Sequence, residues 1–180
     1  MNFMITKWNQ HMKRAFLIFI TTLICAIASA QIQRKFFGLE MNKVYTFPNN
    51  AASIIKERFL QVEVVDENTI AARSGKFGGY NWDWAKFEFH ISMLYDISFL
   101  FQTRTKEDVQ TRFDSLVDDL TRKYGESLGD EKFRVWHEKG GSLICTLIIS
   151  QSEDQDWNLM LRYVDTYIEE LENKKNKDEL

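Results

Sequence analysis

A thiol and an imidazole lie close together in the sequence, on either side of a glycine turn. Cys145 and His137 flank the segment EKGGS, between two runs of residues with strand character. A cysteine beside a histidine is the arrangement of a nucleophile and its general base, as in a hydrolase. A two-residue turn at Gly140-Gly141 pairs His137 with Ile144 and places the two side chains on opposite faces. A three-residue loop pairs His137 with Leu143 and makes Cys145 its diagonal neighbour on the same face.

The apolar pattern favours the three-residue loop, because that register aligns Phe133 and Val135 with the apolar residues of the next strand. The same register surrounds Cys145 with aliphatic side chains, where a thiol has a raised pKa and does not react. We therefore expect a core cysteine. The alternative is a hydrolase that uses Cys145 with His137, or a carboxylate pair that the spacing does not reveal.

Three aromatic residues in the stretch GGYNWDWAKF form the second candidate site. Tyr80, Trp82 and Trp84 are two residues apart, so a regular strand would project them from one face. Exposed on the surface, they could stack on a sugar ring or anchor a protein partner. The competing interpretation is that they form the core face of the sheet, in a chain with five tryptophans and fourteen phenylalanines.

Other chemistry has little support in the sequence. No two histidines are four residues apart and no acidic cluster has the spacing of a calcium loop, so we expect no metal site and no cofactor. Nucleic acid is not an expected partner, because the chain has 26 acidic against 23 basic residues and no basic stripe.

The elements that must position these residues can be read from hydrophobic periodicity. We expect helices at residues 51–59, 105–125 and 166–175. The segment 105–125 is the clearest, with apolar residues every three or four positions, Thr105 as N-cap and Gly125 as terminator. Strands are expected at residues 60–66, 69–73, 80–91, 94–102, 132–139, 142–150 and 156–164.

This order predicts an α+β fold, with an antiparallel sheet of about six to seven strands and helices packed on one face. It also suggests two successive units, each a helix followed by a β-meander. This layout resembles the α/β repeat of β-lactamase-inhibitor-protein-like domains. With the Gln31 start, the FFGLEM opening and the KYG…W…Y pattern, the chain also resembles small exported proteins of Bacteroidetes without an assigned function. The resemblance implies a periplasmic, non-catalytic protein and assigns no functional residue.

The first thirty residues have the pattern of a secretory signal peptide. Lys13-Arg14 precede an apolar run from Ala15 to Ala28, and Ala28-Ser29-Ala30 forms an A-x-A cleavage site. The run is shorter than the roughly 20 residues that a transmembrane helix needs, so we expect no anchor after processing. Met12 would start a compact bacterial signal and is the expected natural start. Residues 31–180 then form a single domain with a charged tail.

Export leaves Cys145 as the sole cysteine, so the core must hold the domain together without a disulfide. We therefore expect a periplasmic or extracellular, non-enzymatic binding module whose ligand is a protein or a carbohydrate. The sequence leaves its oligomeric state open. The chain ends in Lys177-Asp178-Glu179-Leu180, an endoplasmic-reticulum retention signal, which provides the alternative of a lumenal protein. A charged tail rich in Glu, Lys and Asn also produces this tetrapeptide by composition, and a bacterial signal favours that interpretation.

Overall fold

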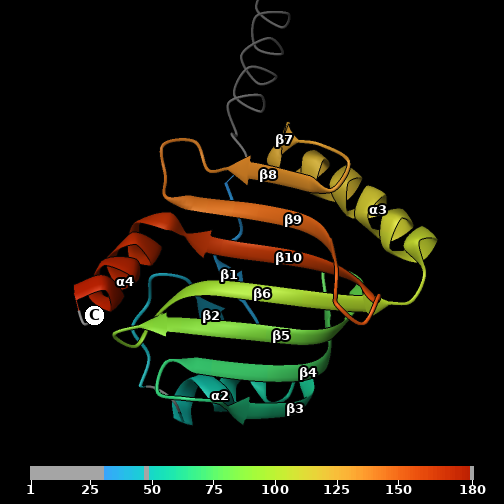
Figure 1. Cartoon of the computed structure of the whole chain (residues 1–180). Coiled ribbons are helices and arrows are strands. Elements are labelled where there is room, and N and C mark those ends of the chain that lie inside the picture. The colour runs from blue at the N-terminus through green and yellow to red at the C-terminus, as the bar shows by residue number, and fades with distance from the viewer. Residues whose placement is uncertain (1–30, 47–48, 179–180) are drawn as a thin grey trace, which may run out of the picture.

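The computed structural model describes residues 31–46 and 49–178 (Figure 1). The predicted signal peptide, the proposed start at Met12 and the last two residues of the tail lie outside these ranges. Within these ranges a large antiparallel sheet and a small two-stranded sheet are accompanied by three helices, which confirms the α+β class. The elements in chain order are β1 Lys35–Phe36, β2 Leu39–Glu40, α2 Asn49–Ile55, β3 Phe59–Val64, β4 Thr69–Phe77, β5 Tyr80–His90, β6 Met93–Thr103, α3 Lys106–Tyr124, β7 Leu128–Gly129, β8 Phe133–His137, β9 Leu143–Gln151, β10 Trp157–Asp165 and α4 Thr166–Asp178.

The large sheet is bigger than the sequence predicts, with eight strands in the order β3-β4-β5-β6-β10-β9-β8-β7. The additional strand is β7, whose two residues are too few to show any alternation. Within the sheet the element order repeats, because α2 precedes the meander β3 to β6 and α3 precedes the meander β7 to β10. The two meanders join where their last strands, β6 and β10, pair antiparallel.

Helix α3 forms where its apolar spacing predicts. Five residues on one side of it are buried against the sheet: Val109, Phe113, Leu116, Leu120 and Tyr124. The Thr105 side chain accepts the backbone N–H of Asp108, and Gly125, with φ of 83°, ends the helix. The helix therefore buries one apolar stripe against a single face of the sheet.

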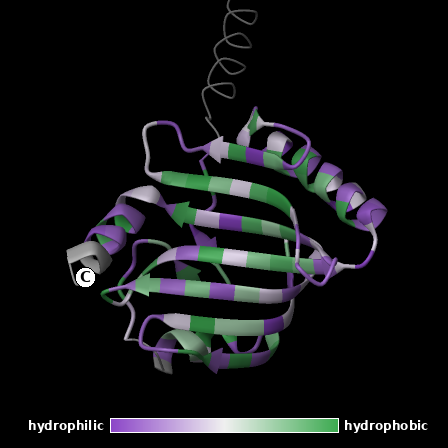
Figure 2. Ribbon diagram, viewed as in Figure 1, coloured by the Kyte–Doolittle hydropathy of each residue, from purple (hydrophilic) through white to green (hydrophobic). Residues whose placement is uncertain are grey.

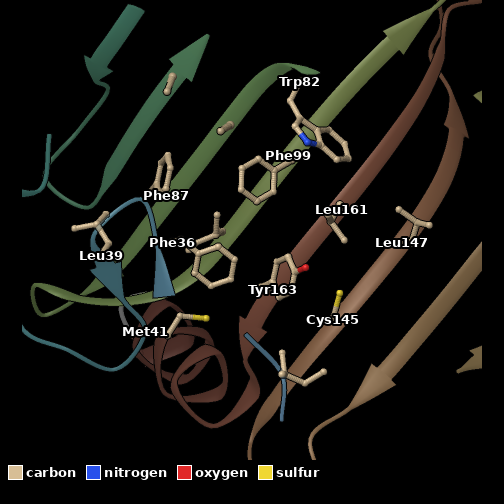
Figure 3. Close-up of a cluster of buried hydrophobic side chains, with 14 of the residues drawn as sticks. Phe36, Leu39, Met41, Trp82, Phe87, Phe99, Cys145, Leu147, Leu161 and Tyr163 are labelled. Carbon is tan, nitrogen blue, oxygen red and sulfur yellow. The ribbon is translucent and has the colours of Figure 1, made fainter. Parts of the chain in front are cut away.

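A short N-terminal hairpin of β1 and β2 completes the core on that face. Its turn, Phe37-Gly38, has positive φ at both residues, as a type I′ turn requires. Phe36 packs edge-on against Tyr163 with ring centroids 4.8 Å apart (Figure 3). Phe77 stacks on Phe99 with ring centroids 4.4 Å apart. Strands β1 and β2 have two residues each, too few for hydrophobic periodicity to predict them. Their segment, FFGLEM, nevertheless contributes aromatic side chains to this core.

Helix α4 lies on the opposite face, contrary to the expectation that all helices share one side. On β10, Tyr163 points into the core, so its neighbour Val164 points the other way, where it packs with Tyr95 and with Ile168 of α4. Asp165, which is 1% exposed, accepts the backbone N–H groups of Tyr167 and Ile168 and caps the helix. Among the described residues, no helix is both long and apolar enough to cross a membrane.

Three apolar residues that alternate with polar ones in the sequence do not lie in the core. Leu60 is 82% and Val64 40% exposed, because β3 is the outer strand of the sheet, where only Val62 of this alternating set packs on the core. Ile91 is 77% exposed in the turn after β5, where its φ is positive.

Candidate functional site

Helices α2 and α3 and the N-terminal hairpin cover one face of the large sheet and leave the other face open. Figure 1 looks onto this face, with β1 and β2 behind the sheet and α4 at one end of it. Over β4, β5, β6 and β10 the open face is hollowed into a groove of about 780 Å³. The groove is lined by Val65, Asp66, Thr69, Ala71, Trp84, Ala85, Lys86, Glu88, Ser98, Leu100, Gln102 and Met160.

Strand alternation explains which side chains reach the groove. On β5, Ala85, Phe87 and Phe89 point into the core, so Trp84, Lys86 and Glu88 point to the open face. The same alternation on β6 buries Ile97 and Phe99 and turns Ser98 and Leu100 outward. The hydropathy colouring shows the result as alternating bands along these strands (Figure 2).

The strand register aligns apolar residues of the open face into one row across five strands. Trp84 lies opposite Leu100, and Leu100 lies opposite Met160. Met160 in turn lies opposite Ile148, and Ile148 lies opposite Phe133 of β8. We call these five residues the apolar row. Neighbouring strands are about 4.8 Å apart, so the row extends for roughly 19 Å.

The end of the apolar row at β4 is closed by a cation. The guanidinium carbon of Arg73, directly opposite Trp84, lies 3.7 Å from the centroid of the indole ring. Such an exposed cation–π contact contributes about 0.5–1 kcal/mol and holds the ring in place. Trp84 is only partly buried, unlike the tryptophans of the core.

Polar side chains border the row on both sides. Lys86 and Glu88 form a salt bridge of 3.0 Å along β5. On the other side of the row, the Gln102 amide donates to Asn158 Oδ1 at 3.0 Å. The polar side chains within each border are therefore already bonded to each other. Within the described part of the chain, no helix or loop covers the apolar row between these borders.

A partly buried ion-pair network separates the groove from α4. The Arg162 guanidinium donates to Asp96 Oδ2 at 2.6 Å and to Glu169 Oε1 of α4 at 2.6 Å. Burial raises the pKa of Asp96, an effect that the bond from Arg162 opposes. Burial acts to lower the pKa of Arg162, but its bonds to Asp96 and Glu169 prevail and raise it. This network fixes α4 against the end of the open face.

The three aromatic residues predicted to share a face are divided between the two sides of the sheet. Trp82 is 2% exposed, contacts Phe99 and donates through Nε1 to the Phe77 carbonyl. The Tyr80 hydroxyl donates to Asp119 of α3 at 2.9 Å, and burial is the main cause of its raised pKa. Of the three, only Trp84 lines the groove on the open face, so they do not form one surface.

Cys145 and His137 do not approach each other. The register of β8 and β9 pairs Trp136 with Cys145 and His137 with Ile144, the pairing of the two-residue turn and not of the predicted three-residue loop. Cys145 is fully buried beside Tyr163, and burial raises the pKa of its thiol, as predicted for a core cysteine (Figure 3). His137 is exposed at the other face. The described residues include no group of three or more His, Cys, Asp or Glu side chains that could hold a metal ion.

No protein-family model matches this chain, and neither a curated protein nor a solved structure gives a significant match. The residues of the apolar row, other than Trp84, were not predicted as a site. The sequence nevertheless contains evidence for this surface. Once the core-facing residues of each strand are assigned, several of the remaining, outward-facing residues are also apolar. Their alignment into one row depends on register, which the sequence did not determine.

Proposed function

We propose that this protein is an exported, non-enzymatic binding module that holds an amphipathic helix of a protein partner on its open sheet face. The observation that carries this proposal is the apolar row of Trp84, Leu100, Met160, Ile148 and Phe133, which crosses the strands between polar borders. Apolar surface that a monomer leaves exposed and rims with polar groups is characteristic of interaction sites.

The dimensions of the row favour a helix as the occupant. A row one residue wide and roughly 19 Å long matches one face of a helix of about 13 residues at 1.5 Å per residue. A helix with apolar residues at three- and four-residue intervals presents a stripe of this width. Leucine, methionine and isoleucine in the row also suit an aliphatic partner surface, and methionine adapts its shape to the side chains that it meets.

A carbohydrate fits the face less well. Sugar rings stack on open aromatic faces, but Arg73 already covers the Trp84 ring, and Tyr80 and Trp82 lie on the helix side. A thiol hydrolase is disfavoured because Cys145 and His137 lie on opposite faces. Export rests on the N-terminal signal pattern and is part of the proposal.

The test uses a Leu/Lys model peptide with one apolar helical face, a scrambled peptide of the same composition, and hexasaccharides of glucose, xylose and N-acetylglucosamine. We expect the amphipathic peptide to bind with micromolar affinity and to bind Leu100→Lys about tenfold more weakly, a loss of about 1.4 kcal/mol. Val44→Lys, which changes a 69% exposed valine outside the row, is the matched control and should bind normally. Equal binding of the scrambled peptide, an unaffected Leu100→Lys variant, or a hexasaccharide that binds in place of the peptide would each contradict the proposal.

A further inference from the structure

The two edges of the large sheet differ in how they are protected. At one end lies β7, which has only two residues and offers almost no free backbone for pairing. At the other end lies β3, with six residues, FLQVEV, that include no proline and no lysine. Natural sheets shorten their edge strands or protect them with charged residues, above all lysine, to prevent pairing with other chains; β3 has full length and a single charged residue, Glu63.

The free edge of β3 presents a regular set of backbone groups. The Val65 N–H donates to the Thr69 carbonyl of β4, so odd-numbered residues of β3 bond to β4 and even-numbered residues point their N–H and C=O groups outward. The outward groups belong to Leu60, Val62 and Val64. Leu60 is 82% exposed and Val64 40% exposed, so apolar side chains accompany this row of unpaired groups.

This edge is complementary to itself. When two copies of β3 pair antiparallel about Val62, that residue faces its own copy and exchanges both backbone hydrogen bonds with it. Leu60 then lies opposite Val64 of the second copy, which gives an apolar cross-strand pair. In the same register Gln61 lies opposite Glu63 of the second copy, and both of these residues are exposed.

We propose that the protein forms a twofold homodimer through antiparallel pairing of β3 from two copies. The strands form a continuous sheet across the dimer, and the twofold axis is perpendicular to it. Both open faces therefore lie on the same side, with the two apolar rows facing one direction. This inference rests on the β3 edge alone and does not depend on what the apolar row binds.

Analytical ultracentrifugation of the protein expressed from its full coding sequence tests the dimer. We expect a monomer–dimer equilibrium at micromolar concentration, and dimerisation of Leu60→Lys weakened about tenfold or more. Leu128→Lys is the matched control, because Leu128 is 67% exposed on the opposite edge strand, and it should dimerise normally. A wild-type protein that stays monomeric at high micromolar concentration, or a Leu60→Lys variant that dimerises normally, would overturn the proposal.

A charge exchange tests the register. Gln61→Glu places a carboxylate opposite Glu63 of the second copy and should weaken the dimer, whereas Gln61→Glu combined with Glu63→Lys should restore it. Hydrogen exchange gives a second readout, because the amides of Leu60, Val62 and Val64 should become protected as concentration rises. Failure of the double variant to recover, or amides that exchange equally fast at every concentration, would contradict pairing about Val62.

Discussion

Trp82 and Trp84, two residues apart on β5, point to opposite faces of the sheet. Trp82 packs on Phe99 in the core, whereas Trp84 lies under Arg73 on the open face. A regular strand would project both from one face. Asp83 between them accepts the backbone N–H of Gln102 with its carboxylate at 2.8 Å. The Asp83 carboxylate thus bonds to β6 at the position where the side-chain alternation of β5 is interrupted. Because of this interruption, Trp84 lines the groove.

Truncation of the two tryptophans should have different effects on stability. Trp82→Ala removes a ring that is 2% exposed and should lower the free energy of unfolding by about 3–5 kcal/mol. Trp84→Ala removes a partly exposed ring and should cost about 1 kcal/mol, chiefly its contact with Arg73. Urea denaturation of both variants measures the difference. Equal losses would contradict the difference in burial between the two rings.

The carboxylate of Asp83 should be needed to hold β5 in the conformation that directs Trp82 and Trp84 to opposite faces of the sheet. Asp83→Ala removes the acceptor for the Gln102 N–H and should cost about 1–2 kcal/mol in the free energy of unfolding. Asp83→Asn keeps an oxygen acceptor of similar size and is the control, with a smaller loss. In Asp83→Ala, the fluorescence of Trp84 should also change. If Asp83→Ala and Asp83→Asn behave alike, the hydrogen bond is not what holds the strand.

The Cys145 thiol should be inert in the folded protein. It is fully buried, and burial raises its pKa above the ordinary value, so the reactive thiolate is scarce at neutral and mildly alkaline pH. Iodoacetamide at pH 8 should leave Cys145 unmodified for hours and should alkylate it completely in urea, as measured by mass spectrometry of its peptide. Rapid modification of the folded protein would restore the thiol hydrolase as an alternative.

Thr146 should be a site where a substitution stabilises the protein. It is 7% exposed, and its hydroxyl oxygen has no hydrogen-bond partner among the described residues. A buried hydroxyl without a partner costs about 1–3 kcal/mol, so Thr146→Val, which keeps the shape, should raise the free energy of unfolding by about 1 kcal/mol. Thr69→Val, on the same face but partly exposed, is the control. A destabilised Thr146→Val variant would indicate that the hydroxyl is bonded in solution.

Elements whose hydrophobic pattern repeats over many residues could be predicted from the sequence. Helix α3, with its Thr105 cap and Gly125 terminator, lies where periodicity places it, and strands β3 to β6 and β8 to β10 lie in the predicted segments apart from shifts at their ends. The two-residue strands β1, β2 and β7 could not be predicted, because alternation needs more residues than they contain. The face of α4 could not be predicted either, since it depends on long-range bonds such as that between Arg162 and Glu169.

The register of β8 and β9 shows why the candidate site was incompletely predicted. Placing Phe133 and Val135 in the core favoured the three-residue loop. The largest apolar residue, Trp136, instead lies in the core opposite Cys145, and its Nε1 donates to the Gly125 carbonyl. Phe133 and Val135 are therefore turned to the open face, where Phe133 ends the apolar row.

The most direct test of the central claim, that the apolar row is a binding surface, is an NMR titration of the methyl groups with the amphipathic peptide. We predict saturable shifts at Leu100, Met160 and Ile148 of the row. The methyl groups of Leu60 and Leu128 at the two sheet edges should remain unchanged. Shifts confined to the edges, or no shifts in the row at saturating peptide, would contradict the account.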